Sequence, residues 1–173
     1  MNRLNTTAAL FLILLSSNTG YAAQRIAILN FELNDITSLP NNQAEWVRTA
    51  SMQPLLEQTI SRLGDYDIVR IPLNEQKTAN AGIGYLFRFH DAAAHLGKKF
   101  AADWIIVSLH SKPSFLESSL IADVIDVQTA SLVEELYVDL KGNHAKVTGR
   151  VIKELARKVN QVISPQKKSH RQE

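Results

Sequence analysis

Polar side chains follow the ends of the predicted strands, which is where open α/β sheets place their binding sites. Asn34 and Asp35 come directly after the first apolar run, and Lys112 follows a later one. Because the carboxyl ends of parallel strands meet at one edge of a sheet, we expect Asn34, Asp35, Asn80 and Lys112 to share one rim. Ordinary loop solvation and capping is the alternative explanation for these residues.

A glycine- and aromatic-rich connection spans residues 80–89, with the sequence NAGIGYLFRF. Its Gly82-x-Gly84 pair lacks the surrounding residues of a dinucleotide or P-loop motif, so it is weak evidence for a phosphate site. The structural interpretation is that the glycines let the backbone turn while Tyr85 and Phe87 pack. The functional alternative is an aromatic surface for a partner or ligand.

Glu32 is a carboxylate at the end of an apolar strand, where partial burial requires a partner such as Arg48 or a backbone donor. With the residues above it completes a candidate interaction or ligand rim. The members of this predicted rim are Glu32, Asn34, Asp35, Arg48, Asn80, Tyr85, Phe87 and Lys112.

The remaining chemistry-bearing residues form no recognisable catalytic or metal motif. The five histidines are scattered, and Asp91 and His95 are spaced to form a surface ion pair on a helix. Neither H-E-x-x-H nor G-x-S-x-G occurs, and the absence of cysteine excludes thiol catalysis and thiolate metal sites. We therefore predict no catalytic residue, no metal and no cofactor.

Residues 1–22 have the pattern of a secretory signal peptide, with Arg3, a short apolar core at 8–15 and small residues before a predicted cut after Ala22. No cysteine follows the core, so a bacterial lipid anchor is chemically impossible. We expect a periplasmic protein with one α/β domain at 23–164, no membrane span after cleavage, and a basic flexible tail at 165–173.

The net charge gives no indication of nucleic-acid binding. The chain has 19 basic and 17 acidic residues, a net charge of +2, and loss of Arg3 with the signal leaves 18 against 17, or +1. The 45% apolar content is ordinary for a globular core.

The apolar periodicity predicts the element order β-α-β-α-β-β-β-α. A helix with a buried stripe at Leu56, Ile60 and Leu63 should begin at Ser51 or Pro54 and end at Gly64. A short helix should stop at Gly97, and a final helix capped by Asn143 should bury one valine- and leucine-rich face. The predicted strands are 25–33, 66–71, 104–109, 119–127 and 132–140. Strands joined through helices should be parallel and the others antiparallel, which predicts a mixed five-stranded sheet packed with helices.

Several segments resemble an uncharacterised family of small exported proteobacterial proteins. The segments are FELNDITSLP, RTASMQPLLEQ, ANAGIGYLF and ADWIIVSLHSKPSFL. Three more, RIAILNFEL, FAADWIIVSL and ADVIDVQTASLVEE, more distantly resemble the N-terminal domain of the Tol translocation protein, curli secretion channel subunits and penicillin-binding-protein activator lipoproteins. Those domains have a fold similar to the anticodon-binding domain of certain tRNA synthetases and act mainly by binding other proteins.

The resemblance implies a non-catalytic periplasmic interaction or accessory module whose partner is another periplasmic or envelope protein. Some members of the uncharacterised family occur beside quinoprotein dehydrogenase systems, which are one implied context. The alternatives are a small-molecule binding or sensing domain, and a hydrolase that uses histidines and carboxylates such as His90 and Asp35. The sequence does not specify the oligomeric state.

Overall fold

A mixed six-stranded sheet forms the centre of the protein in a computed structural model that describes residues 23–37, 43–114, 116–142 and 145–164. The strand order is β3-β1-β4-β5-β6, and β2 also pairs with β4. β1 is parallel to β3 and β4, whereas β4, β5 and β6 are antiparallel, as predicted from the connections. The strands are β1 (Gln24–Ile28), β2 (Glu32–Asp35), β3 (Tyr66–Val69), β4 (Trp104–Lys112), β5 (Ser119–Asp126) and β6 (Ser131–Asp139).

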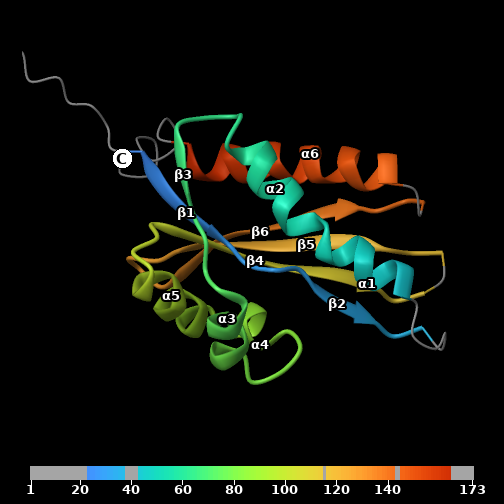
Figure 1. Cartoon of the computed structure of the whole chain (residues 1–173), viewed down its shortest axis with the longest axis horizontal. Helices are drawn as coiled ribbons and strands as arrows, with labels where there is room; N and C mark the ends of the chain where they lie inside the picture. The colour runs from blue at the N-terminus through green and yellow to red at the C-terminus, as the bar shows by residue number, and fades with distance from the viewer. Residues whose placement is uncertain (1–22, 38–42, 115, 143–144, 165–173) are drawn as a thin grey trace, which may run out of the picture.

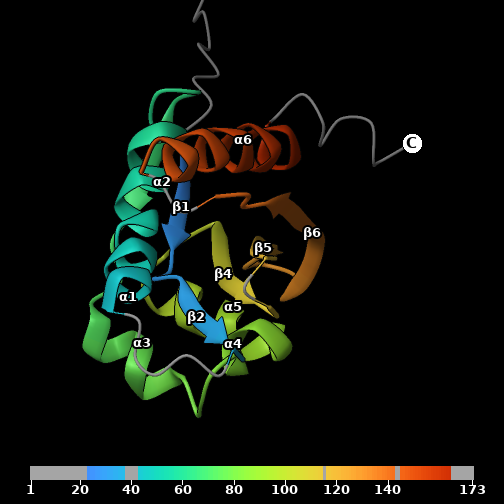
Figure 2. The same ribbon diagram turned by 90° about the vertical axis from the view of Figure 1, so that its right-hand side faces the viewer.

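Helices cover both faces of the sheet (Figure 1). One face packs against α1, α2 and α6, and the other against α3, α4 and α5, as the perpendicular view also shows (Figure 2). The helices are α1 (Gln43–Ala50), α2 (Met52–Ile60), α3 (Leu73–Ala79), α4 (Tyr85–Arg88), α5 (His90–Lys99) and α6 (Ala145–Ile163). The predicted mixed α/β class is confirmed. No helix among these described segments has the length and apolarity to cross a membrane.

The predicted strand 25–33 is interrupted, which gives six strands where five were expected. Ile28 pairs with Ile106 and Glu32 pairs with Leu109, so four steps along this strand match three steps along β4. The extra residue is a β-bulge between β1 and β2, and it shifts the alternation of side chains by one position. Residues that an unbroken strand would place on one face therefore lie on the other.

The helix expected around Ser51 is two consecutive helices. Ser51 lies between α1 and α2 with helical backbone angles, and its hydroxyl donates to the Arg48 carbonyl oxygen at 2.6 Å, so it makes no N-cap bond. Leu56 and Ile60 are fully buried as predicted, but α2 ends at Ile60 and Leu63 is 39% exposed, so the third stripe position was wrong.

Gly97 does not stop the short helix as predicted. It lies inside α5, where an added Cβ would lie 2.7 Å from Cγ2 of Val127. The glycine thus permits α5 to approach the sheet closely. In the sequence alone, a glycine with this packing role cannot be told from one that ends a helix.

Helix α3 was not predicted from the sequence. The apolar face of α6 is confirmed at Val151, Leu155, Val159 and Val162, whereas its expected cap Asn143 lies outside the described residues, as do segments 1–22 and 165–173.

Candidate functional site

The structure divides the predicted rim between two faces of the sheet. Asp35 and Lys112 are paired in register and face α1, whereas Glu32, the first residue of β2, contacts the loop before α4. Side chains alternate along a strand, so Glu32 and Asp35 point to opposite faces. The expectation of one rim was therefore wrong. Asp35, Arg48 and Lys112 belong to a buried polar cluster, while Glu32 and Asn80 belong to an apolar groove.

The buried polar cluster is an ion-pair network between the ends of β2 and β4 and helix α1. Lys112 Nζ lies 3.3 Å from Asp35 Oδ2 and 3.7 Å from Glu45 Oε1. Arg48 NH1 lies 3.7 Å from Glu45 Oε2, while Arg48 Nε donates to Thr148 Oγ1 at 2.9 Å. Two carboxylates and two cations thus balance each other in a site that is largely closed to solvent.

His110 is fully buried inside this cluster, and its hydrogen bonds assign its tautomer. Thr49 Oγ1 donates to the Glu45 carbonyl oxygen at 2.7 Å, so it accepts from His110 Nδ1–H, also at 2.7 Å. His110 Nε2 then accepts from Ser118 Oγ at 2.8 Å. Burial, reinforced by the positive charges of Arg48 and Lys112, lowers the pKa of His110 to about 4.

These properties make the cluster a poor catalytic site. A Ser–His contact is the geometry of an activated nucleophile, but a general base works best with a pKa near the working pH. A histidine of pKa about 4 takes up the serine proton inefficiently at neutral pH. The Nδ1 partner is the hydroxyl of Thr49, where a catalytic triad has a carboxylate, and the nearest carboxylate oxygen, Glu45 Oε2, lies 3.9 Å from Nε2. The network instead fixes α1 and α6 on the sheet.

The apolar groove lies on the outer side of β2, between α1, α3 and the loop before α4. It has a volume of about 270 Å³, and five consecutive residues of the strand and its bulge line it, so it follows the strand edge. The lining residues are Leu29, Asn30, Phe31, Glu32, Leu33, Trp46, Leu73, Gln76, Lys77, Asn80, Ile83, Leu86 and Val107. Trp46, Leu73 and Ile83 are 52%, 51% and 64% exposed.

Glu32 holds one wall of the groove in place. Its Oε1 accepts from Asn80 Nδ2 and its Oε2 accepts from the Gly84 backbone N–H, both at 2.6 Å. Gly84 has φ +71°, a left-handed conformation that favours glycine. The predicted need of Glu32 for a backbone donor is therefore met by Gly84, and the alternative partner, Arg48, is on the other face of the sheet.

Gln76 fixes the opposite wall. Its Oε1 accepts from the backbone N–H of Asn30 at 3.0 Å, and its Nε2 donates to the Ile71 carbonyl oxygen at 2.8 Å. The bulge leaves the N–H of Asn30 without a strand partner, and buried Gln76 supplies one from α3. The groove is thus built on polar contacts that are already satisfied within the protein.

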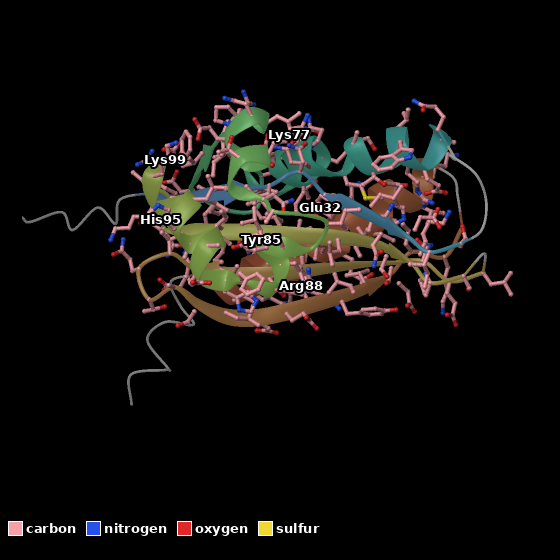
Figure 3. The ribbon with its side chains drawn as sticks, turned by 90° about the horizontal axis from the view of Figure 1, so that it is seen from below. Glu32, Lys77, Tyr85, Arg88, His95 and Lys99 are labelled. Atoms are coloured by element: carbon pink, nitrogen blue, oxygen red, sulfur yellow. The ribbon has the colours of Figure 1, made fainter. Side chains whose placement is uncertain are left out.

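The other predicted rim residues lie outside both sites. Tyr85 and Phe87 are half-buried against the core below α5, and Tyr85 packs on Phe89 with ring centroids 4.7 Å apart. Asn34 is exposed on β2. Figure 3 shows Glu32 beneath the loop, with Lys77, Arg88, His95 and Lys99 spread over the α3–α5 face.

A second buried titratable pair lies on the α5 face. His90 Nε2 is 3.0 Å from Asp123 Oδ2, and burial raises the pKa of Asp123 to about 6 despite this contact. In the described part of the chain, no three histidine, aspartate or glutamate side chains come together in a way that holds a metal ion.

Sequence reasoning missed Glu45, His110 and Gln76. A signal for His110 existed, because Ile106, Ser108, His110 and Lys112 alternate along β4 and therefore share a face. Glu45 and Thr49 are four apart, which places them on one face of α1. Gln76 had no signal, since its role depends on a bulge that the apolar run conceals.

Comparison with known proteins gives a family and a fold. Residues 24–159 match the DUF3280 family, whose description is "Protein of unknown function (DUF2380)". No curated protein matches the chain significantly.

Solved structures with a similar fold have little sequence in common with this chain. The hypothetical protein CT253 from Chlamydia trachomatis has a TM-score of 0.55 at 13% identity, covering 83% of this chain and 99% of its own. The PelC dodecamer from Paraburkholderia phytofirmans has a TM-score of 0.52 at 12% identity, covering 79% and 87%. The LpoB C-terminal domain from Salmonella enterica has a TM-score of 0.47 at 12% identity, covering 72% and 87%.

Proposed function

This chain belongs to the DUF3280 family, a family of unknown function, and we propose that it is a non-catalytic protein-interaction module that works in the periplasm. The observation that carries the proposal is the apolar groove beside β2. Three large apolar side chains on its walls, Trp46, Leu73 and Ile83, are each at least half exposed. Contiguous exposed apolar surface of this kind marks sites where proteins bind partners.

The polar chemistry of the protein supports binding over catalysis. The cations and carboxylates of the buried polar cluster are paired internally, and His110 has too low a pKa for an efficient base at neutral pH. Glu32 in the groove is held by Asn80 and Gly84, so it is a structural clamp for the wall. Asp35 is paired with Lys112 on one face of the sheet, and His90 is paired with Asp123 on the other. The hydrolase alternative that relied on Asp35 and His90 therefore loses support.

The periplasmic setting rests on the signal-peptide pattern of residues 1–22. The partner is an envelope or periplasmic protein, and a quinoprotein dehydrogenase system is one candidate context from the family resemblance. PelC, one protein of similar fold, was solved as a dodecamer, so a further copy of this chain is also a candidate partner.

The experiment is affinity purification of the C-terminally tagged protein from the periplasm of its native bacterium, with mass spectrometry of what co-purifies and of the mature N-terminus. We expect a stoichiometric partner and an N-terminus at Ala23. Ile83→Ser should remove the partner, since Ile83 lines the groove. Leu132→Ser is the control for binding, because Leu132 is an exposed apolar residue of β6, at the opposite end of the sheet from the groove. Equal recovery with both variants would assign the partner to another surface, and no partner under gentle conditions would refute the proposal.

The groove also favours a second candidate, a small-molecule binding or sensing domain. Its volume of about 270 Å³ lies just below the roughly 300–1,000 Å³ of typical small-ligand pockets. A thermal-shift screen of periplasmic metabolites and quinone cofactors tests this function. A ligand at 100 times its dissociation constant should stabilise the protein by about 2.7 kcal/mol, and a screen without stabilisation would exclude those compounds.

A further inference from the structure

We propose that the outer edge of β2 binds an extended, acidic peptide segment of a partner protein as an added strand, with one apolar side chain of that segment inserted into the groove. The inference rests on the proposed function, since it specifies how a partner would use the groove. An added strand forms main-chain hydrogen bonds at a sheet edge and gains specificity from pockets for alternate side chains.

The register identifies the backbone groups that are available. Ile36 N–H donates to the Lys112 carbonyl oxygen at 3.2 Å, and parallel strands use alternate residues for each neighbour. Glu32, Asn34 and Ile36 therefore direct their backbone groups to β4, and Leu33 and Asp35 direct theirs outward. Within the described segments, no hydrogen bond is recorded for the outward backbone groups of Leu33 and Asp35. These two N–H donors and two C=O acceptors match one extended chain.

The edge and the groove overlap at Glu32 and Leu33. The groove is lined by consecutive residues 29–33, by side chains of α3 and by Trp46, so a strand beside β2 would lie within it. Neighbouring strands are about 4.8 Å apart, which places alternate side chains of an added strand over the apolar floor. The groove volume of about 270 Å³ suits a side chain of such a segment better than a large ligand.

Two other strands have a free edge: β3, which pairs only with β1 and does not line the groove, and β6, whose edge is partly blocked. β6 pairs only with β5 along the sheet, but Lys158 Nζ donates to the outward carbonyl oxygen of Tyr137 at 2.8 Å. This lysine of α6 occupies an acceptor that an added strand would need. Within the described residues, no side chain donates to the outward carbonyl oxygens of Leu33 and Asp35.

The charge of the groove walls indicates an acidic segment. Lys77 is exposed on the groove wall, and Arg88 of α4 is exposed on the same helical layer (Figure 3). Among described residues, neither of these two cations makes an ion pair. Both oxygens of the half-buried Glu32 carboxylate are turned toward Asn80 and Gly84, whereas Lys77 is exposed without an acidic partner, so Lys77 is the charged group on the groove wall that is free to pair with a bound segment.

The test is selection of a random twelve-residue phage-display peptide library against the mature protein, followed by synthesis of a binder with a single N-methyl amide at each position in turn. Removing one backbone donor that pairs with β2 should weaken binding about tenfold. We expect this loss at alternate positions only, because the remaining amides of an added strand point away from β2. Lys77→Glu should weaken binding as strongly, whereas Lys98→Glu, the matched control outside the groove, should not.

The outcomes separate this inference from the proposed function. A binder indifferent to N-methylation at every position, or one unaffected by Lys77→Glu, would overturn strand addition, and so would a library that yields no binder. Each of these results leaves the Ile83-dependent native partner of the proposed function standing. Failure of the native protein to recover any partner in the purification experiment would instead refute the proposed function itself.

Discussion

The buried polar cluster and the apolar groove lie on either side of the same short strand and have opposite properties. In the cluster, Glu45, Arg48 and Lys112 are charged but closed to solvent and paired with one another. In the groove, Trp46, Leu73 and Ile83 are apolar but open to solvent. Charge placed where water is excluded must find internal partners, whereas apolar surface left in water is available to an external one.

The comparison shows why residue type alone is a poor guide to the functional surface of this protein. Asp35, Arg48 and Lys112 have the side chains of an active site, yet their partners are all internal. The groove has few charged groups, and its main polar contacts, from Glu32 and Gln76, hold its own walls. Burial and internal hydrogen bonds distinguish polar groups that hold the fold together from polar groups that are free to bind a partner.

Removal of Glu45 should cause the largest loss of stability. Glu45→Ala leaves Arg48 and Lys112 in the closed cluster without their shared carboxylate, and breaking such a pair costs about 3–5 kcal/mol. Glu75→Ala is the matched control, because the exposed Glu75–Lys99 pair is worth at most about 1 kcal/mol. Urea denaturation measures both free energies of unfolding. Equal losses would mean that the cluster contributes no more than a surface pair.

His110 should make the cluster sensitive to acid. The folded pKa of about 4 lies below the unfolded value of 6.5, so the unfolded chain binds more protons between these pH values. Stability due to His110 is intact above pH 6.5 and decreases by up to about 3 kcal/mol as the pH falls to 4.

The measurement for His110 is the pH dependence of unfolding in the native protein and in His110→Gln. Asp123, whose pKa is raised to about 6, acts in the opposite direction between about pH 4 and 6, because its folded form holds the extra proton. The difference between the two proteins removes this contribution. A difference that does not change with pH would show that His110 titrates normally.

The wall of the groove should tolerate change less well at Gly84 than at Gly82. Gly84→Ala costs about 1–2 kcal/mol because φ is +71°, although an added Cβ meets no atom within 4 Å. The same space surrounds Gly82, whose φ is not in the left-handed region, so Gly82→Ala should be neutral or slightly stabilising. Thermal denaturation of the two variants tests this contrast. Equal melting temperatures would show that the loop adapts to alanine.

Changes on the open surface of the groove should have the smallest effect on stability. Ile83→Ser should alter the free energy of unfolding by no more than about 0.5 kcal/mol, since Ile83 is 64% exposed. The same variant should lose its binding partner. A substitution in the groove should therefore affect binding and leave stability nearly unchanged, whereas a substitution in the buried polar cluster should affect stability. Ile36→Ser is the stability control, because Ile36 is exposed to a similar extent and does not line the groove. A large loss of stability in Ile83→Ser, relative to Ile36→Ser, would mean that the groove is part of the core.

Much of the fold follows from the sequence because its signals are local. The apolar face of α6 and the antiparallel hairpin of β5 and β6 are encoded in spacing and turn residues, and both are confirmed. The division of the predicted rim was not accessible, because the segment RIAILNFEL is nearly continuously apolar and has no alternation whose interruption would reveal a bulge. Gly97 shows the same limit, since the side chain that leaves no room for a Cβ there is that of Val127, which follows β5 and is distant in sequence.

The bulge between β1 and β2 also bears on how relatives of this chain should be aligned. Side chains alternate between the two faces of the sheet both before Ile28 and after Glu32. The bulge shifts the second alternation by one position relative to the first. A relative that lacks one residue between Ile28 and Glu32 would have an unbroken strand. If the alignment gap were placed a few positions after Glu32 instead, the residue aligned with Asp35 would lie on the other face of the sheet. Positions 29–31 are therefore where a single-residue gap changes which side chains are homologous in space.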